Sequence, residues 1–583
     1  MKYVYFLMFS FLFASQSANA QVQINYAMLD ANNVKIVISA NGSIGMNPAF
    51  PKGSWMPADD SAGTIYDSTP WIAGLNEQND TLIAHQYANI DDYSWKLGPL
   101  TNDGTADSAY STNFNHVWKI TMDEITTHVA YFQSLANNTT ATLFPNGYTI
   151  PSDFLTWPAH GDVSLGYDLY LAPFHDYNSD GIYNPNDGDY PTICGDQCLY
   201  FITNDVGQAT TPRMGVQLET WVYAFNTPND AALNNTFFTK YKFTNKSTHT
   251  YHDTRVSQMN DIDIGYSQND YLATDIAYGA VYGYNATLDN GSTGLSSIGY
   301  GTRNPIESVM LLAGPRLDVD FQDNPLYTNA LAQDLGSYAD QGLGFGDGIA
   351  DNERSGLAAS TYYNSSLNPI IGQPNGSFEQ NYNLMVGKHK NGSVINNTLT
   401  GNAAPYWAPG NSDVSHERIP ASENFTNLDL NVNPSDMRIQ ATTEAFTFEP
   451  GTHDYMDMAF VFALPDANST VTVDSLNRQY LNTVRHFFNE NLVDCQDMGT
   501  PLGIENLSLA SPISIFPNPA DNALHIVISE ALLGQTYRLY NNVGQLVLTD
   551  TLRATQTEVG VSNLAAGTYV MVLGMERKLV VVE

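Results

Sequence analysis

The end of the chain reads PISIFPNPADNALHIVI over residues 512–528 and closes on KLVVVE at residues 578–583. Between these stretches, short β-branched and aromatic runs alternate with glycine, asparagine and alanine-glycine turns about every eight to twelve residues. The runs are LHIVI at 524–528, YRLY at 537–540, QLVL at 545–548 and TYVMVL at 568–573. This rhythm is typical of a small antiparallel sandwich. It predicts an immunoglobulin-like β-sandwich over residues 512–583.

The same segment resembles the type A C-terminal sorting domain of proteins exported by the type IX secretion system of Bacteroidota. The resemblance rests on FPNP at 516–519, the turn NNVG at 541–544 and GTY at 567–569. It implies that the secretion machinery is a partner, and that the protein is secreted or anchored at the outer cell surface. The alternative is a secreted protein that simply ends in a β-sandwich binding module.

The other end of the chain carries an export signal of a different kind. Lys2 precedes an apolar run at 4–14, and Ala18-x-Ala20 fits signal-peptidase cleavage. Residues 1–20 are therefore predicted to be a signal peptide, with Gln21 as the mature N-terminus. The apolar run is shorter than a bilayer span, and no stretch of about 18 apolar residues occurs elsewhere. We expect no transmembrane segment.

Composition favours an acidic protein built from several units. The 583 residues include 60 Asp and Glu against 23 Lys and Arg, a net charge of -37. This charge excludes nucleic-acid binding, because phosphates would be repelled, and it favours divalent cations. The length exceeds what a single core usually supports. We expect a mainly β body at 21–496, of one or two domains with few helices, and then a linker at 497–511.

Within the body, strand-like runs lie between loops rich in Asn, Gly, Asp and Ser. The run FFTKYKF at 237–243 alternates apolar and polar residues, which predicts a half-buried strand. Two helices are expected. One follows the capping-box sequence TMDE at 121–124, and the other starts at Asp474 with apolar residues on one face.

The most specific site signal is the loop DYNSDGIYNPND at residues 176–187. It matches the calcium loop D-x-[DN]-x-[DN]-G-x5-E, with Asp in place of the final Glu. Calcium prefers hard oxygen ligands, so the loop predicts a structural calcium site. The ligands would be Asp176, Asn178, Asp180, Ile182 (through its carbonyl), Asn184 and Asp187. The alternative is an ion-free turn, because Asp, Asn and Gly are common turn residues.

Two further acidic stretches are weaker candidates. Asp261, Asp263, Asp270 and Asp275 could gather several carboxylates, which would require either an ion or full solvation to limit their repulsion. Residues 346–354 could form a third oxygen-rich loop, although an exposed turn is the favoured explanation. Cys194 and Cys198 could be linked in an oxidising compartment, with Cys495 left alone. All three could also be unpaired.

The body also resembles a widespread family of exported Bacteroidota proteins of unassigned function. The matching segments are 71–75, 157–162, 172–191 and 344–354. No G-x-S-x-G, H-E-x-x-H or P-loop motif occurs, and we assign no catalytic residue. We expect a calcium-stabilised binding, adhesion or structural module whose partner is an extracellular glycan or protein. The alternative is an extracellular hydrolase of polysaccharide or protein. A deep pocket with paired carboxylates, or with His160 and Asp162 converging on one point, would favour it.

Overall fold

The structure is a computed structural model of the chain, and it describes residues 23–491 and 513–582 with internal gaps. The gaps are 48, 51–52, 86–94, 207–212, 288–298, 326–341, 376, 397–405, 408–426, 428–431, 468, 517–519, 521, 529–532, 535, 542–545 and 574–575. The predicted signal peptide at 1–20 and linker at 497–511 lie outside the described residues. The chain separates into two compact units, Met1–Pro501 and Leu502–Glu583. Each is described by itself below.

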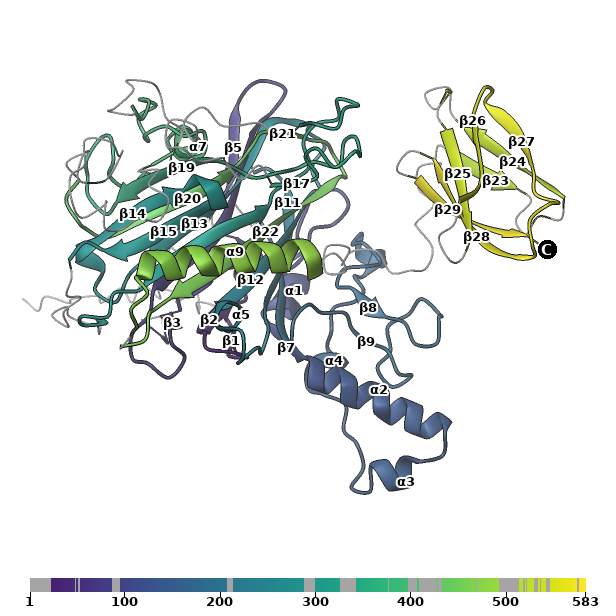
Figure 1. Cartoon of the computed structure of the whole chain (residues 1–583), viewed down its shortest axis with the longest axis horizontal. Helices are drawn as coiled ribbons and strands as arrows, with labels where there is room; N and C mark the ends of the chain where they lie inside the picture. Colours follow the sequence, from purple (N-terminus) through teal and green to yellow (C-terminus); the bar gives the residue numbers. More distant parts are fainter. Residues whose placement is uncertain are drawn as a thin grey trace, which may run out of the picture. The chain divides into compact units, whose positions relative to one another are not determined.

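The body is built on two antiparallel sheets, which confirms the mainly β class. The nine-stranded sheet has the order β14-β15-β16-β22-β12-β11-β10-β6, and β7 also pairs with β10. Its strands are β6 (Lys96–Leu97), β7 (Trp118–Thr121), β10 (Gln197–Asn204), β11 (Val216–Ala224), β12 (Thr236–Asn245), β14 (Asp270–Asp275), β15 (Ala280–Asn285), β16 (Ile306–Ala313) and β22 (His453–Ala463). In Figure 1 these strands form the broad layer crossed by α9.

The six-stranded sheet has the order β19-β20-β13-β4-β5, and β21 also pairs with β13. Its strands are β4 (Ile65–Leu75), β5 (Thr81–Ala84), β13 (Tyr251–Ile262), β19 (Leu357–Asn364), β20 (Met437–Thr443) and β21 (Phe446–Phe448). Smaller sheets join β1 (Tyr26–Leu29), β2 (Lys35–Ser39) and β3 (Ser54–Trp55), β8 (Phe174–His175) with β9 (Tyr190–Pro191), and β17 (Gly342–Leu343) with β18 (Arg354–Ser355).

The largest apolar core lies between the two sheets. Phe237 and Tyr241 of β12 belong to the same buried cluster as Val256 of β13 and Ile439 of β20. Two sheets that pack face to face in this way make a β-sandwich. Because β12 and β13 are consecutive in the chain but lie in different sheets, the turn between them carries the chain across the sandwich.

A second core covers the outer face of the nine-stranded sheet. Trp118, Tyr200 and Trp221 of the sheet cluster there with Phe154 and with Leu481 of α9. The helices that contribute residues to this core are α1 (Ser108–Ser111), α2 (Met122–Ala136), α4 (Ser152–Leu155), α5 (Ala231–Asn234) and α9 (Val473–Asn491). The short helix α3 (Thr140–Leu143) buries none of its residues. Figure 1 shows α2 and α3 reaching out beyond the sheet. On the six-stranded sheet, α7 (Phe378–Met385) covers a smaller cluster.

Both predicted helices are present. α2 begins after Thr121, whose hydroxyl accepts a hydrogen bond from Glu124 N while the Glu124 side chain returns to Thr121 N. This is the capping box, which satisfies two backbone donors that would otherwise be orphaned at the helix start. α9 is anchored through Arg485, which donates to the carbonyls of Leu312 and Leu311 at 2.5 and 2.9 Å.

Residues 237–243 form the predicted strand, but the prediction that it is only half buried is wrong. β12 is buried on both faces, and Lys240 is only 1% exposed. Its Nζ lies 3.4 Å from Asp457 Oδ1 on β22, and Lys242 lies 3.2 Å from Glu219 on β11. The polar positions of the alternating pattern therefore face the second core, and opposite charges on neighbouring strands compensate their burial.

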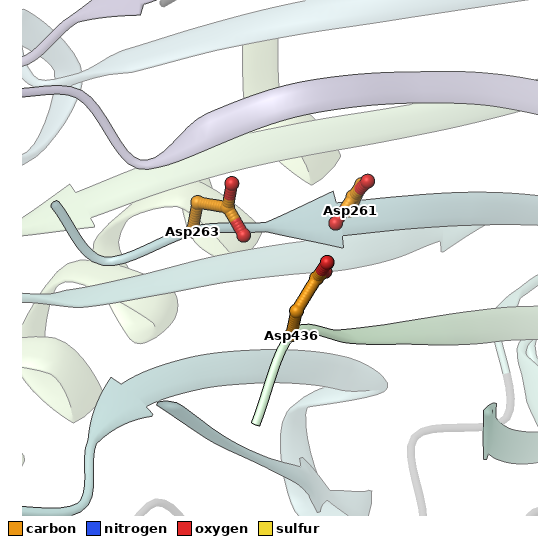
Figure 2. A group of neighbouring side chains, drawn as sticks. All are labelled: Asp261, Asp263 and Asp436. Carbon is orange, nitrogen blue, oxygen red and sulfur yellow. The ribbon is translucent and has the colours of Figure 1, made fainter. Parts of the chain in front are cut away.

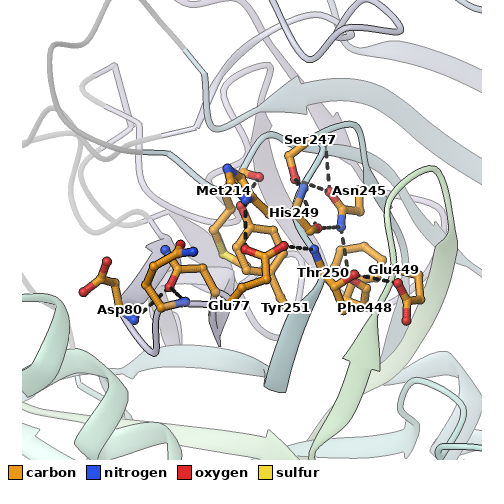
Figure 3. A network of polar contacts seen from close by, with 12 residues as sticks. Glu77, Asp80, Met214, Asn245, Ser247, His249, Thr250, Tyr251, Phe448 and Glu449 are labelled. Atoms are coloured by element: carbon orange, nitrogen blue, oxygen red, sulfur yellow. Dashed lines mark hydrogen bonds and ion pairs between the residues drawn. The ribbon is translucent and has the colours of Figure 1, made fainter.

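One end of the sandwich is held by a polar network that links three turns (Figure 3). Asn245 Nδ2 donates to the carbonyls of His249 and Phe448, at 2.9 and 3.0 Å. Thr250 donates from its N–H to Glu77 at 3.1 Å, and its hydroxyl donates to Glu449 at 2.6 Å. These turns join β4 to β5, β12 to β13 and β21 to β22. The chain crossings between the sheets are thus fixed to one another at this end.

The C-terminal unit is a smaller sandwich of two antiparallel sheets, with the orders β23-β24-β27 and β26-β25-β28-β29. Its strands are β23 (Ile513–Phe516), β24 (Ala523–Ile528), β25 (Thr536–Asn541), β26 (Leu546–Thr551), β27 (Gln556–Gly560), β28 (Gly567–Leu573) and β29 (Glu576–Val582). β24 alternates strictly between buried and half-buried residues, and Leu524, Ile526, Leu539 and Val580 share one core. The predicted β-sandwich is confirmed.

We expect Asp457→Ala to lower the free energy of unfolding by about 3–5 kcal/mol, because Lys240 would keep a buried charge without this carboxylate. Asp457 is 2% exposed and also lies 2.9 Å from the Arg354 guanidinium. Denaturant unfolding of the purified protein measures the change. Asp30→Ala is the control, because Asp30 pairs with Lys119 at a partly exposed position and should cost about 1 kcal/mol or less. Equal losses for the two variants would contradict the role of burial.

The buried carboxyl of Glu307 makes the fold more stable at acidic pH than at basic pH. It is fully buried in β16, its Oε2 accepts a hydrogen bond from Thr64 at 2.7 Å, and burial raises its pKa from 4.5 to about 8. The folded protein therefore binds this proton more tightly than the unfolded chain does. Its contribution to stability is full at acidic pH and is lost as the pH rises through about 8.

We therefore expect Glu307→Gln, which is uncharged at every pH, to flatten part of the fall in stability between pH 5 and pH 8.5. Each pKa unit is worth about 1.4 kcal/mol. Urea unfolding of both proteins across this range measures the difference. Parallel pH profiles for the two proteins would show that Glu307 is ionised in the fold.

Candidate functional site

All six predicted calcium ligands lie on one loop between two short paired strands. β8 and β9 pair through Phe174 with Pro191 and through His175 with Tyr190, so that residues 176–189 form a closed loop. Gly181 adopts φ +79°, a left-handed conformation that allows the chain to turn sharply after Asp180. The loop is therefore a single local structure in which residues of the motif lie near one another.

The acidic side chains of this loop face its own backbone. Asp176 accepts hydrogen bonds from the N–H groups of Asp180 and Gly181, at 3.2 and 2.6 Å. Asp180 accepts from Ile182 N at 2.8 Å and from the Asn178 side chain at 2.9 Å. Asn184 donates to Asp187 at 2.5 Å. The structure thus joins Asp176, Asn178, Asp180 and Ile182 in one hydrogen-bonded group, and Asn184 and Asp187 in another.

A fourth acidic residue of the loop, Asp189, was not among the predicted ligands. It is fully buried, and its two oxygens accept from Tyr177 N and Asn184 N, both at 2.8 Å. Burial raises the pKa of the Asp189 carboxyl, and the charges of Asp176 and Asp180 raise it further. Asp189 therefore ties the two halves of the loop together. Its position in the sequence could have indicated it, because it lies only two residues after Asp187, the last position of the twelve-residue motif.

His160 and Asp162 do not converge on a common point. The His160 ring contacts the carbonyl of Leu169 through Nδ1 at 3.0 Å, and its Nε2 accepts from Tyr183 N at 2.8 Å. Asp162 instead caps a short 3-10 helix, where it accepts from Ser164 N. Both ring nitrogens of His160 are thus engaged with backbone groups, so this histidine positions the acidic loop. The geometry gives no support to a hydrolytic pair here.

A second group of carboxylates forms where β13 ends and β20 begins. Asp261, Asp263 and Asp436 point toward one another (Figure 2), and each offers an oxygen within 4.8 Å of the others. Arg438 donates to Asp261 from Nε at 3.0 Å and also pairs with Asp436. Asp436 was not predicted, because it lies far away in the sequence and carries no motif.

Asp270 and Asp275 occupy opposite ends of β14, and only one of them is close to this group. Burial raises the pKa of Asp270 well above its ordinary value, and the charges of Asp263, Asp436 and Asp261 add to this shift. Burial likewise raises the pKa of Asp261 to about 7. Asp275 lies instead 3.8 Å from Arg478 of α9. Six residues of strand span on the order of 16 Å, so Asp275 is remote from the group.

The third acidic stretch forms an exposed turn against a neighbouring loop. Asp323 accepts from Gly346 N and Gly348 N, both at 2.8 Å, and Asp351 accepts from Asp320 N and Phe321 N at the same distance. The carboxylate oxygens of Asp323 and Asp351 are therefore engaged in hydrogen bonds with backbone N–H groups.

The cysteines do not form the expected disulfide between Cys194 and Cys198. Cys198 is a buried free thiol, and burial raises its pKa to about 12, whereas Cys194 is disulfide-bonded. A Cys194–Cys198 disulfide is therefore wrong. Both residues point into the core over the outer face of the nine-stranded sheet. The third cysteine of the chain, Cys495, lies outside the described residues.

Comparison with known proteins identifies the C-terminal unit. Residues 514–582 match the family model described as the secretion system C-terminal sorting domain. A comparison with curated proteins found no match. Among solved structures, a polysaccharide lyase aligns with 7% sequence identity and a TM-score of 0.16 over 66% of this chain. The alignment spans 39% of the lyase chain, and at this TM-score it carries no argument.

The protein is therefore a cargo of the type IX secretion system, and its partner in export is the secretion machinery. It is exported and then either secreted or attached at the cell surface. Among the helices of the described residues, none has both the length and the apolar character of a membrane span.

Proposed function

We propose that the body is a calcium-stabilised binding module that works outside the cell. The observation that carries the calcium part is the closed loop at 176–189, which holds all six predicted ligand residues and links them in two hydrogen-bonded groups. Carboxylate, amide and carbonyl oxygens are the ligands that calcium prefers, and the loop offers all three. The buried Asp189 supplies further negative charge, which a cation would offset. In this role calcium rigidifies a surface loop.

The loop belongs to a part of the body with many exposed apolar side chains. Eight of the large hydrophobic residues that are exposed in the described chain fall between residues 122 and 182. They are Met122, Leu135, Leu143, Leu155, Val163, Leu165, Tyr177 and Ile182. We take this stretch of the chain as the binding region, because isolated surface leucines are ordinary but accumulations of exposed apolar side chains along one segment are not.

The chemistry of these side chains favours a protein partner over a glycan. Seven of the eight are aliphatic, and Tyr177 is the only aromatic one. Sugar rings are usually bound on flat aromatic faces, whereas aliphatic and mixed surfaces are typical of protein contacts. The calcium loop contributes Tyr177 and Ile182 to this surface. Loss of the ion should therefore weaken binding as well as stability.

For the calcium site, we expect chelation with EDTA to lower the melting temperature of the purified protein. A ligand that binds only the folded state stabilises it by RT ln(1 + [L]/Kd), or about 2.7 kcal/mol at a hundredfold excess over Kd. Asp176→Ala combined with Asp180→Ala should remove the share of this shift that belongs to the loop, together with one bound ion per chain. Asn186→Ala is the matched control, since Asn186 lies in the loop at a position without a ligand role. If the melting temperature of the unchanged protein is the same with calcium and with EDTA, the loop is an ion-free turn.

For the binding role, we expect the protein to retain a protein ligand from an array of extracellular proteins and polysaccharides. Val163→Asp combined with Leu165→Asp should reduce binding by about tenfold or more, because a buried contact would gain two charges. Leu367→Asp is the control, because Leu367 is 98% exposed in a different part of the body. Retention of polysaccharides alone, or degradation of a polymer on the array, would overturn the proposal.

A further inference from the structure

The group of Asp261, Asp263 and Asp436 lies at a corner where the chain passes between the two sheets. β13 belongs to the six-stranded sheet and β14 to the nine-stranded sheet, and residues 263–269 connect them. Asp263 follows β13 directly, and Asp270 begins β14. Asp436 immediately precedes β20, the neighbour of β13. Together with Asp270, the group therefore lies at three strand ends that come from both layers of the sandwich.

Negative charge at this corner exceeds the positive charge that the described residues supply. Asp67 lies opposite Asp261 on β4 and is fully buried, as are Asp261 and Asp270. Five carboxylates, those of Asp67, Asp261, Asp263, Asp270 and Asp436, thus lie in this part of the sandwich, and the Arg438 guanidinium pairs with two of them, Asp261 and Asp436. Burial of like charges without compensation costs several kcal/mol per group, so an additional cation or bound protons are required here.

An independent observation concerns Asp270, which is not one of the three converging residues. Its Oδ2 accepts from Ile264 N at 3.0 Å, but its Oδ1 is buried and has no hydrogen-bond partner among the described residues. The same is true of Asp263 Oδ1. Buried acceptors without a partner are rare in folded proteins, because each costs on the order of 1–3 kcal/mol. A cation at this point would engage such oxygens without any donor.

We propose that Asp261, Asp263 and Asp436, with Asp270, form a second divalent-cation site that is separate from the loop at 176–189. Its all-carboxylate donors are hard oxygens, which select calcium or a similar ion over metals that prefer nitrogen or sulfur. The ion joins the end of β13 to the starts of β14 and β20. It clamps the corner between the sheets in the way that the network of Glu77, Asn245 and Glu449 clamps the opposite end of β13.

The test uses the chain from Gln21 onward, stripped with EDTA and dialysed against calcium alone, with bound calcium measured by mass spectrometry. Asp263→Asn combined with Asp436→Asn should lose one bound ion per chain. It should lose this ion equally in the background of Asp176→Ala and Asp180→Ala, which separates the site from the loop. Asp275→Asn is the matched control, because it removes a buried carboxylate from the same strand, and it should lose none.

A second readout does not depend on stability. Terbium replaces calcium at oxygen sites and luminesces when a nearby tyrosine is excited. Burial raises the pKa of Tyr66, and this tyrosine is close enough to Asp261, Asp67 and Asp263 for their charges to raise its pKa further. Tyr66→Phe should therefore reduce terbium luminescence while leaving the bound calcium unchanged. The proposal is overturned if the folded Asp263→Asn, Asp436→Asn variant keeps all of its calcium. It is also overturned if this variant melts higher than the parent in EDTA and the parent binds no ion beyond the one held by the loop. In that case the carboxyls carry protons.

Discussion

Burial of both faces of the nine-stranded sheet is the constraint on which the rest of the body depends. One face packs on the six-stranded sheet, and the other is covered by α9 and by the helices of residues 108–155. A strand in the middle of such a sheet has no solvent-exposed side, so its charged residues must find opposite charges. Lys240 with Asp457 and Lys242 with Glu219 meet this requirement between adjacent strands. The cost of leaving either partner alone specifies the register of β11, β12 and β22.

The segment between β7 and β10 contributes to the core on the outer face of the nine-stranded sheet and also carries the acidic loop at 176–189. The outer core and the candidate calcium site are therefore physically linked. Phe154 and Phe174 belong to the outer core, while His160 and Asp189 hold the loop backbone from beneath. Tyr183 donates its N–H to His160 and its hydroxyl to the carbonyl of Phe154, at 2.8 Å in both cases. The loop is therefore placed by the packing of its surroundings as well as by its own motif. An ion bound by the loop would stabilise a segment whose neighbours Phe154 and Phe174 are already packed on the nine-stranded sheet.

Features set by neighbouring residues could be predicted from the sequence, and those set by distant ones could not. The capping box at Thr121 and the acidic loop depend on contacts within a few residues, and both are found where the patterns indicate. The pairing of Asp261 with Arg438 spans 177 residues, and Asp436 is part of no motif. The alternation in residues 237–243 correctly predicts a strand, but the carboxylate that faces Lys240 belongs to Asp457, which is 217 residues away. The local link between Cys194 and Cys198 failed for the same reason.

The sequence by itself determined the export address, the mainly β class and the position of the calcium-type loop, because each is written in a short contiguous pattern. Only the tertiary structure decided which acidic residues share a corner of the sandwich and which, such as Asp275, lie apart. It also decided that both sides of the central strands are buried. The physical reason is that burial and charge compensation depend on which surfaces meet. A polar side chain is the same letter in the sequence whether solvent, an opposite charge or another carboxylate faces it.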